Sequence, residues 1–268
     1  MAAGILSKIL KNKKKEVAAA KERMPVEALL KEIMKAPANR NFRDMLEYDE
    51  FTIIGEIKKK APSKGVLKKN VDIKKISKIY EKAGIGAVSV VTDKKFFDGD
   101  LGYIKEVKKS VSMPVLRKDF IIDEYQIIES RYARADAVLL IAAALEKRQL
   151  NVLVKKTRSL NMTPVVECVT KDEIKKACSI GVDVIGINTR DLKTFKINKT
   201  RLKSLIKYVP KEKMVIVESG IMKPEDVDGI MISPLIKGVL IGTMFMTAKG
   251  EKQIVDMAGD ILYKHGKK

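Results

Sequence analysis

The segment TPVVECVTKDEIKKACSIGVDVIGINT (residues 163–189) decides the fold class. Its first and last parts are short runs rich in Val and Ile, and the stretch between them has helical spacing. That stretch starts with a Thr-x-x-Glu capping box, Thr170 to Glu173, and stops at Gly181, a residue type common just after a helix. A strand, a helix and a second strand, with both strands almost continuously apolar, predict one unit of a buried parallel sheet.

The same alternation runs along most of the chain. Helical stretches lie between the apolar runs, and one ends at Gly84 while another begins at Asp123, a good N-cap residue. Eight repeats in about 220 residues predict an α/β fold closed into a (β/α)8 TIM barrel. An open doubly wound sheet is the alternative, but KKAPSKG (59–65) is not its glycine-rich dinucleotide turn. The expected strands are residues 51–57, 87–92, 114–120, 137–143, 163–169, 184–189, 214–220 and 238–243.

The domain organisation follows from the same pattern. Residues 1–48 precede the first strand and have helical character, so we expect an N-terminal helical extension that caps the barrel. No Ser/Gly-rich linker or low-complexity tract interrupts the sequence. We therefore expect residues 1–268 to form a single barrel domain.

The composition excludes several classes of protein. No apolar run approaches the roughly 18 residues that a membrane span needs, and the N-terminus predicts an amphipathic helix of a cytoplasmic protein rather than a signal peptide. Two unpatterned cysteines exclude a disulfide framework or zinc site. Because His265 is the only histidine, acid–base chemistry must use Lys, Asp, Glu, Tyr or Cys.

The net charge of +20 raises the alternative of a basic nucleic-acid-binding protein. However, only 10 of the 54 basic residues are arginine, the lysines are spread over the whole chain, and aromatic residues make up 5%. Arginine is the residue that recognises bases and phosphates with two hydrogen bonds. A lysine-rich surface, with a modest attraction for small anions, is the simpler interpretation.

Polar residues collect at the ends of the expected strands. In a parallel barrel, these ends share one rim, where enzymes of this fold keep their sites. Glu56 and Lys58 share a face by the period of two, and so do Asn188 and Arg190. A structural ion pair would also explain Glu56 with Lys58, but several strands show the same pattern. The other strand-end residues are Lys118, Glu167, Glu218, Ser219, Gly220, Gly242 and Thr243.

The last two strands also suggest an anion site. Loops after strands seven and eight are the usual phosphate-binding place in such barrels. Gly220 and Gly242 lie there, and glycine lets backbone N–H groups approach an anion closely. Ser219 and Thr243 can add hydroxyl donors.

A set of ordered motifs resembles those of the indole-3-glycerol phosphate synthase family over almost the whole chain. The resemblance implies a (β/α)8 barrel with an N-terminal helical segment. It also implies conversion of 1-(2-carboxyphenylamino)-1-deoxyribulose 5-phosphate to indole-3-glycerol phosphate, CO2 and water, without cofactor or metal. The motifs are ILSKILKNKKKEV, EIKKKAPSKG, VVTDKKFFDGDL, VLRKDF, DAVLLIAAAL, PVVECV, GINTRDL, VESGI and GVLIGTMFM.

Roles for individual residues come from this resemblance. It implies that Lys118 is the general acid of ring closure and Glu167 the acid–base partner of the later dehydration. Lys58 would bind the substrate carboxylate or donate a proton, and both roles stay open. Glu56 and Asn188 would position the lysines and the substrate. We expect Phe97, Phe120, Arg190 and Glu218 to bind the substrate, the first three at its aryl end, and Ser219, Gly220, Gly242 and Thr243 to bind its phosphate.

The chemistry needs these residue types. Closing an aryl ring onto a ketone requires a proton for the developing alkoxide, and a lysine ammonium is the donor available here. Nearby Glu56 and Glu167 would keep the ammonium groups charged. Loss of CO2 and water restores aromaticity, so no electron sink is needed.

Two departures from the family pattern are minor, because neither removes an acid or a base. Ala61 stands at a usual serine position, and Thr243 replaces the more usual serine. Phosphoribosylanthranilate isomerase, another phosphosugar barrel, is the alternative enzyme, but it needs a strand-end cysteine that the first strand lacks. The expected partner is a small phosphorylated molecule, not a nucleic acid or a membrane. A monomer fits, and association with other enzymes of tryptophan synthesis stays open.

Overall fold

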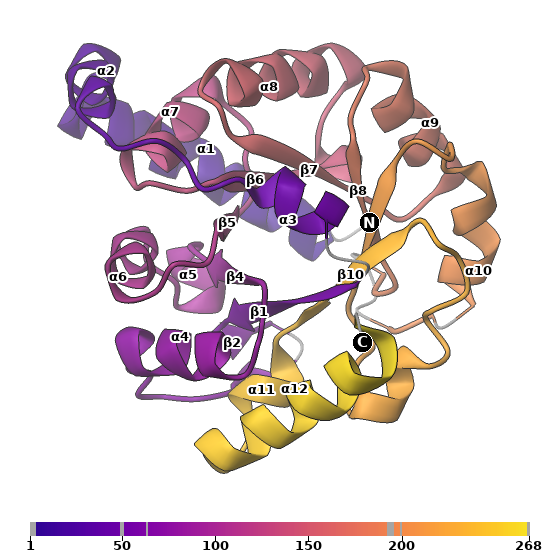
Figure 1. Ribbon diagram of the computed structural model, residues 1–268. Coiled ribbons are helices and arrows are strands. Elements are labelled where there is room, and N and C mark those ends of the chain that lie inside the picture. Colours follow the sequence, from indigo (N-terminus) through magenta and orange to yellow (C-terminus); the bar gives the residue numbers. More distant parts are fainter. Residues whose placement is uncertain (1–3, 49–50, 63, 192–195, 199, 267–268) are drawn as a thin grey trace.

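Eight parallel strands close into a barrel (Figure 1). The computed structural model describes residues 4–48, 51–62, 64–191, 196–198 and 200–266. The first barrel strand pairs with both the second and the last, which confirms the TIM barrel and excludes the open sheet. The barrel strands are β1 (Thr52–Ile57), β4 (Ala87–Val91), β5 (Val115–Lys118), β6 (Ala137–Ile141), β7 (Thr163–Cys168), β8 (Val184–Asn188), β9 (Met214–Glu218) and β10 (Ile236–Ile241).

The expected strands overlap the observed ones, with errors at their ends. We expected the seventh strand to reach residue 220, but β9 stops at Glu218 because Ser219 and Gly220 have positive φ angles of 69° and 86°. The eighth strand begins at Ile236 rather than residue 238, and a register shift between Ile236 and Gly238 explains why the apolar pattern is interrupted there.

The local signals for helix ends are confirmed. The Asp123 and Thr170 side chains accept hydrogen bonds from the first turns of α7 and α9. Gly84 and Gly181 follow α4 and α9 with φ of 73°. The helices after β1 are α4 (Ile73–Lys82), α5 (Lys94–Phe97), α6 (Gly102–Ser110), α7 (Glu124–Tyr132), α8 (Lys147–Ser159), α9 (Lys171–Ser179), α10 (Arg201–Leu205), α11 (Thr243–Met246) and α12 (Glu251–His265).

Shorter elements complete the chain. After β1, a small antiparallel pair is formed by β2 (Lys60–Ala61) and β3 (Gly65–Val66). Three short 3-10 helices lie in loops: η1 (Ala142–Ala144), η2 (Ile206–Tyr208) and η3 (Pro224–Val227).

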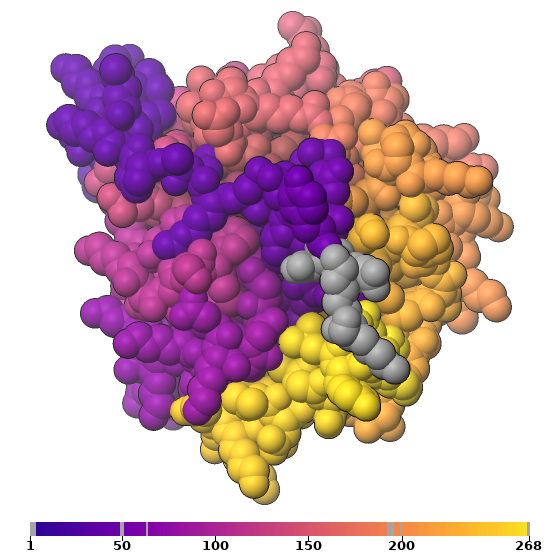
Figure 2. All heavy atoms as spheres, viewed as in Figure 1, coloured from indigo at the N-terminus to yellow at the C-terminus, as the bar shows by residue number. Residues whose placement is uncertain are grey.

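The N-terminal segment covers both ends of the barrel. Its helices are α1 (Ile5–Arg23), α2 (Val26–Met34) and α3 (Phe42–Tyr48). Helix α3 lies across the amino-terminal end of the strands, where Phe42 and Leu46 are fully buried among interior residues such as Met214 (Figure 1). Residues of α3 cover the middle of this face in the space-filling view, whereas α2 lies at its upper-left edge (Figure 2). Helix α1 lies at the opposite end.

Alternation along the strands divides the barrel interior into layers. Inward residues near the strand starts and middles are apolar, as Ile54, Leu116 and Val165 show. Two residues further on, the same inward face carries Glu56, Lys118 and Glu167. The apolar layers thus form a floor below a polar group of residues.

Candidate active site

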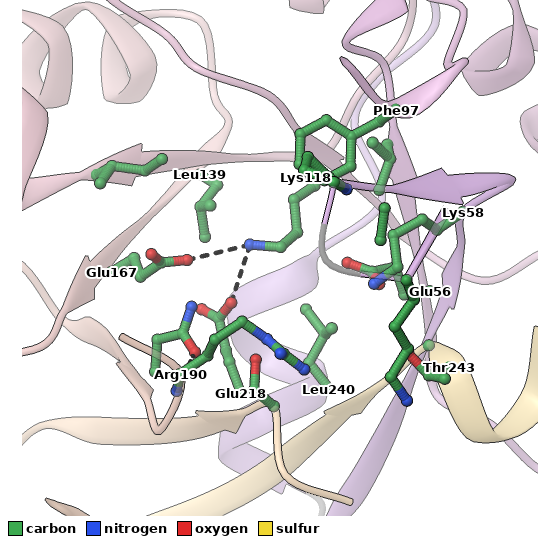
Figure 3. Close-up of a pocket in the computed structure, with 18 of the residues that line it drawn as sticks. Glu56, Lys58, Phe97, Lys118, Leu139, Glu167, Arg190, Glu218, Leu240 and Thr243 are labelled. Carbon is green, nitrogen blue, oxygen red and sulfur yellow. Dashed lines mark hydrogen bonds and ion pairs between the residues drawn. The ribbon is translucent and has the colours of Figure 1, made fainter. Parts of the chain in front are cut away.

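A pocket opens at the carboxyl ends of the barrel strands (Figure 3). Every site residue expected from the sequence lines it. The structure therefore brings together the following set: Glu56, Lys58, Phe97, Lys118, Phe120, Glu167, Asn188, Arg190, Glu218, Ser219, Gly220, Gly242 and Thr243.

The end of β5 places Lys118 between two buried carboxylates. Its Nζ lies 3.1 Å from Glu167 Oε2 and 3.0 Å from Glu218 Oε2 (Figure 3). Burial lowers the pKa of Lys118, but the negative charges of Glu218, Glu167 and Glu56 outweigh burial and raise the pKa above its ordinary value. The ammonium is thus held charged yet remains partly exposed to the pocket, the state that a proton donor needs.

The second of these carboxyl groups, Glu218, has a raised pKa. Burial raises the pKa of Glu218 to about 8, against the opposing effect of Lys118. Its Oε1 and that of Glu167 are buried and accept no hydrogen bond among the described residues. These two oxygens can therefore accept hydrogen bonds from a bound molecule.

On β1 and just after it, Glu56 and Lys58 form an ion pair. Glu56 is buried, whereas Lys58 faces the pocket and keeps some exposure. The Glu56 carboxylate lies against Gly242, where a Cβ atom would overlap it. Glycine at position 242 thus makes room for this carboxylate, a role that the sequence interpretation did not assign to it.

An apolar wall stands at one side of the pocket. The rings of Phe97 and Phe120 are 5.9 Å apart between centroids, at an interplanar angle of 36°. Ile5, Leu6 and Ile9 of α1 line the pocket as well. Such a wall can hold a flat aromatic ring.

The opposite side of the pocket is rich in backbone amides. Ser219 and Gly220 follow β9 in consecutive left-handed conformations, and Gly242 alone separates β10 from Thr243, the first residue of α11. Consecutive amides in such turns form a concave site for an anion. Just after the neighbouring strand β8, the Arg190 backbone N–H donates a hydrogen bond to Asn188 Oδ1 at 2.9 Å. Burial lowers the pKa of the Arg190 guanidinium, although the charge of Glu56 opposes this shift.

The sequence interpretation missed the contribution of α1. Its apolar pocket residues and the buried Lys13 were not assigned to the site. A signal was present, because Lys13 stands four residues from both Ile9 and Val17, on the buried stripe of the helix. A lysine on an apolar stripe indicates a buried partner.

In the ranges that the structure describes, no group of three or more His, Cys, Asp and Glu side chains could hold a metal ion. None of the described helices is both long enough and apolar enough to span a membrane.

Comparisons with known proteins agree on one family. A family model described as indole-3-glycerol phosphate synthase matches residues 6–257. Proteins of that name are similar to this chain: one from Thermoanaerobacter pseudethanolicus is 46% identical, covering 90% of this chain and 92% of that protein. Another, from Clostridium acetobutylicum, is 42% identical with the same coverage of each.

Solved structures share the fold at low sequence identity. The N-acetylmannosamine-6-phosphate 2-epimerase from Clostridium perfringens has a TM-score of 0.61 at 16% identity, covering 85% of this chain and all of that one. A structure titled "Native KDPGal structure" has a TM-score of 0.56 at 13% identity, over 79% of this chain and 92% of that chain. At such identities, the likeness shows the barrel architecture only.

Proposed function

The chain belongs to the indole-3-glycerol phosphate synthase family, and from this membership we propose that its carboxy-lyase reaction takes place in the rim pocket, with Lys118 as the general acid. The family activity is the synthesis of indole-3-glycerol phosphate from a small phosphorylated substrate. The observation that carries the proposal is the position of Lys118, whose ammonium faces the pocket between Glu167 and Glu218.

The two sides of the pocket suit the two ends of the substrate. The carboxyphenyl ring would lie against Phe97 and Phe120, with Arg190 near its carboxylate. The phosphate would meet the amides that follow β9 and β10, with hydroxyl donors from Ser219 and Thr243. This orientation leaves the ketone of the sugar chain near Lys118.

Ring closure is the first chemical step. The ring carbon that carries the carboxylate attacks the ketone, and the carbonyl oxygen takes a proton from Lys118 to become a hydroxyl group. Glu56 and Asn188 act on this step by positioning Lys58 and the substrate. A charged ammonium close to the oxygen also stabilises the negative charge that develops there.

Loss of CO2 and then of water completes the reaction. The electrons of the carbon–carboxylate bond return to the ring as CO2 leaves. Glu167 then takes a proton from the carbon next to nitrogen, the hydroxyl group leaves as water with a proton, and the indole double bond forms. Glu218, whose pKa is raised, can supply a proton in this step.

A Lys118→Met variant tests the assignment. We expect it to fold with an unchanged circular dichroism spectrum and to lose about 10²–10⁴-fold in turnover, measured by the fluorescence of the indole product. Lys82→Met, which removes an exposed lysine outside the pocket, is the control and should keep full activity. Near-normal turnover by Lys118→Met would refute the general-acid role.

The role of Lys58 is decided by a second variant. Lys58→Met should mainly raise KM if Lys58 binds the substrate carboxylate, and should mainly lower kcat if it donates a proton. The proposal also includes a cytoplasmic location, which membership in a family of small-molecule biosynthetic enzymes supports.

A further inference from the structure

Lys13 of α1 is a buried cation outside the pocket. It is 4% exposed, and its Nζ lies 2.9 Å from both Asp93 Oδ2 and Asp119 Oδ1 and 2.6 Å from Glu16 Oε2. Lysine is almost never buried unless it is paired. One ammonium thus joins α1 to the loops that follow β4 and β5.

Each of the two aspartates also accepts a backbone hydrogen bond from a segment that carries an aromatic residue of the pocket wall. Asp93 Oδ1 accepts the Phe96 N–H at 2.8 Å and so caps α5, the single turn that ends in Phe97. Asp119 Oδ1 accepts the Phe120 N–H at 2.7 Å. The two carboxylates that meet at Lys13 therefore belong to the segments that carry the facing rings of Phe97 and Phe120.

We propose that Lys13 is a positioning residue for the aryl end of the substrate, because its ammonium fixes the spacing between the segments that carry Phe97 and Phe120. The same ion pairs fix α1, which supplies Ile5, Leu6 and Ile9 to the pocket. The inference rests on the proposed function, in which these rings hold the carboxyphenyl group.

The two aspartates depend on Lys13 to different degrees. Asp119 has a second cation, since Arg117 Nη2 lies 3.0 Å from its Oδ2. For Asp93, Lys13 is the one cation at ion-pair distance among the residues that the structure describes. Losing the ammonium would leave Asp93 buried and unpaired, a state that proteins avoid by moving or neutralising the group. The α5 turn and Phe97 should therefore move more than Phe120.

The test compares three variants by steady-state kinetics, at a temperature where each is folded by circular dichroism. Lys13→Met should raise KM about tenfold with a smaller change in kcat, because a displaced binding group is felt strongly even far from the reacting atoms. Lys13→Arg keeps the positive charge, so its KM should lie within about threefold of the KM of the unaltered enzyme. Lys21→Met removes an exposed ion pair between α1 and Asp123 and should leave KM unchanged.

A double-mutant cycle shows whether Lys13 acts through Phe97. If it does, Lys13→Met should change KM less than about twofold in a Phe97→Ala background. Equal factors in both backgrounds, or an unchanged KM in Lys13→Met alone, would overturn the inference.

A binding measurement separates this inference from the proposed function. Titration with fluorescent 2-aminobenzoate probes the aromatic wall without turnover, and its Kd should rise about tenfold in Lys13→Met but not in Lys21→Met. Identical Kd values in all variants would refute the positioning role. Absence of turnover in the unaltered enzyme would instead refute the proposed function.

Discussion

The carboxylate of Glu218 occupies the space that a Cβ atom on Gly186 would need. The two residues lie on neighbouring strands β9 and β8, with Glu218 directly opposite Asn188 in the register. Glycine at position 186 therefore allows Glu218 to fold over the adjacent strand and reach Lys118 at 3.0 Å. The contact between Glu218 and Lys118 thus depends on the absence of a side chain at position 186 on the neighbouring strand.

A Gly186→Ala variant should therefore remain folded but lose most of its activity. The added methyl group displaces Glu218 from Lys118, and we expect kcat to fall about 100-fold. Overpacking at this site should lower the free energy of unfolding by about 1–3 kcal/mol. Gly259→Ala, on α12 with open space around it, is the control and should keep full turnover. Unchanged kcat in Gly186→Ala would show that the Glu218 position does not matter.

The raised pKa of Glu218 predicts a pH dependence of stability. Burial raises the pKa of Glu218 to about 8 in the folded state, whereas unfolding returns it to the ordinary value of 4.5. The stabilisation that the Glu218 proton gives to the folded state is complete below the pKa of the unfolded chain, and it is lost as the pH rises through about 8. Urea denaturation at about pH 5, 7 and 9 should show a falling free energy of unfolding, with a flatter curve for Glu218→Gln. Parallel curves for the two proteins would contradict the assignment.

Gly220 should be needed for both conformation and anion binding. Its φ of 86° is unfavourable for other residues, and a Cβ atom there would lie 3.0 Å from Thr189 Oγ1. Gly220→Ala should lower the free energy of unfolding by about 1–2 kcal/mol and weaken inhibition by inorganic phosphate. Gly250→Ala, with open space and extended backbone, should do neither. Unaltered phosphate inhibition in Gly220→Ala would place the anion elsewhere.

We propose that the N-terminal helices and the barrel unfold as a single unit. Phe42 of α3 is fully buried in the barrel interior, so Phe42→Ala should lower the free energy of unfolding by about 3–5 kcal/mol. Met34, on α2, is 86% exposed, so Met34→Ala should change the free energy of unfolding by less than about 0.5 kcal/mol. A single urea transition, monitored by far-UV circular dichroism, should shift as a whole. Two separate transitions would refute the proposal.

Local sequence signals predicted most of the fold. Strand periodicity and helix caps such as Thr170 depend on neighbouring residues, so they can be read directly. The barrel then follows from the repeat, and it places all strand ends on one rim. The strand limits were less accurate, because backbone conformation at Ser219 is set by the turn and not by hydrophobicity.

The convergence of the site residues on one pocket could also be predicted, and so could two of its ion pairs. As expected, Glu56 lies beside Lys58 and Glu167 beside Lys118, but the pairing of Lys118 with Glu218 was not predicted. Pairing depends on side-chain reach across strands, which the period of two does not specify. Gly186 gave a readable signal, since glycine inside a strand often marks close approach by another group. Asp93 and Asp119, the distant partners of Lys13, gave none.

The docking of α3 has a consequence for synthesis of the protein on the ribosome. Phe42 and Leu46 are translated well before Met214 and Leu240, which form part of the surface that buries them. The nascent chain therefore carries uncovered apolar side chains through most of its elongation. Completion of the barrel floor therefore requires the last barrel strands, and until these are made the two side chains are open to chaperones and to other nascent chains.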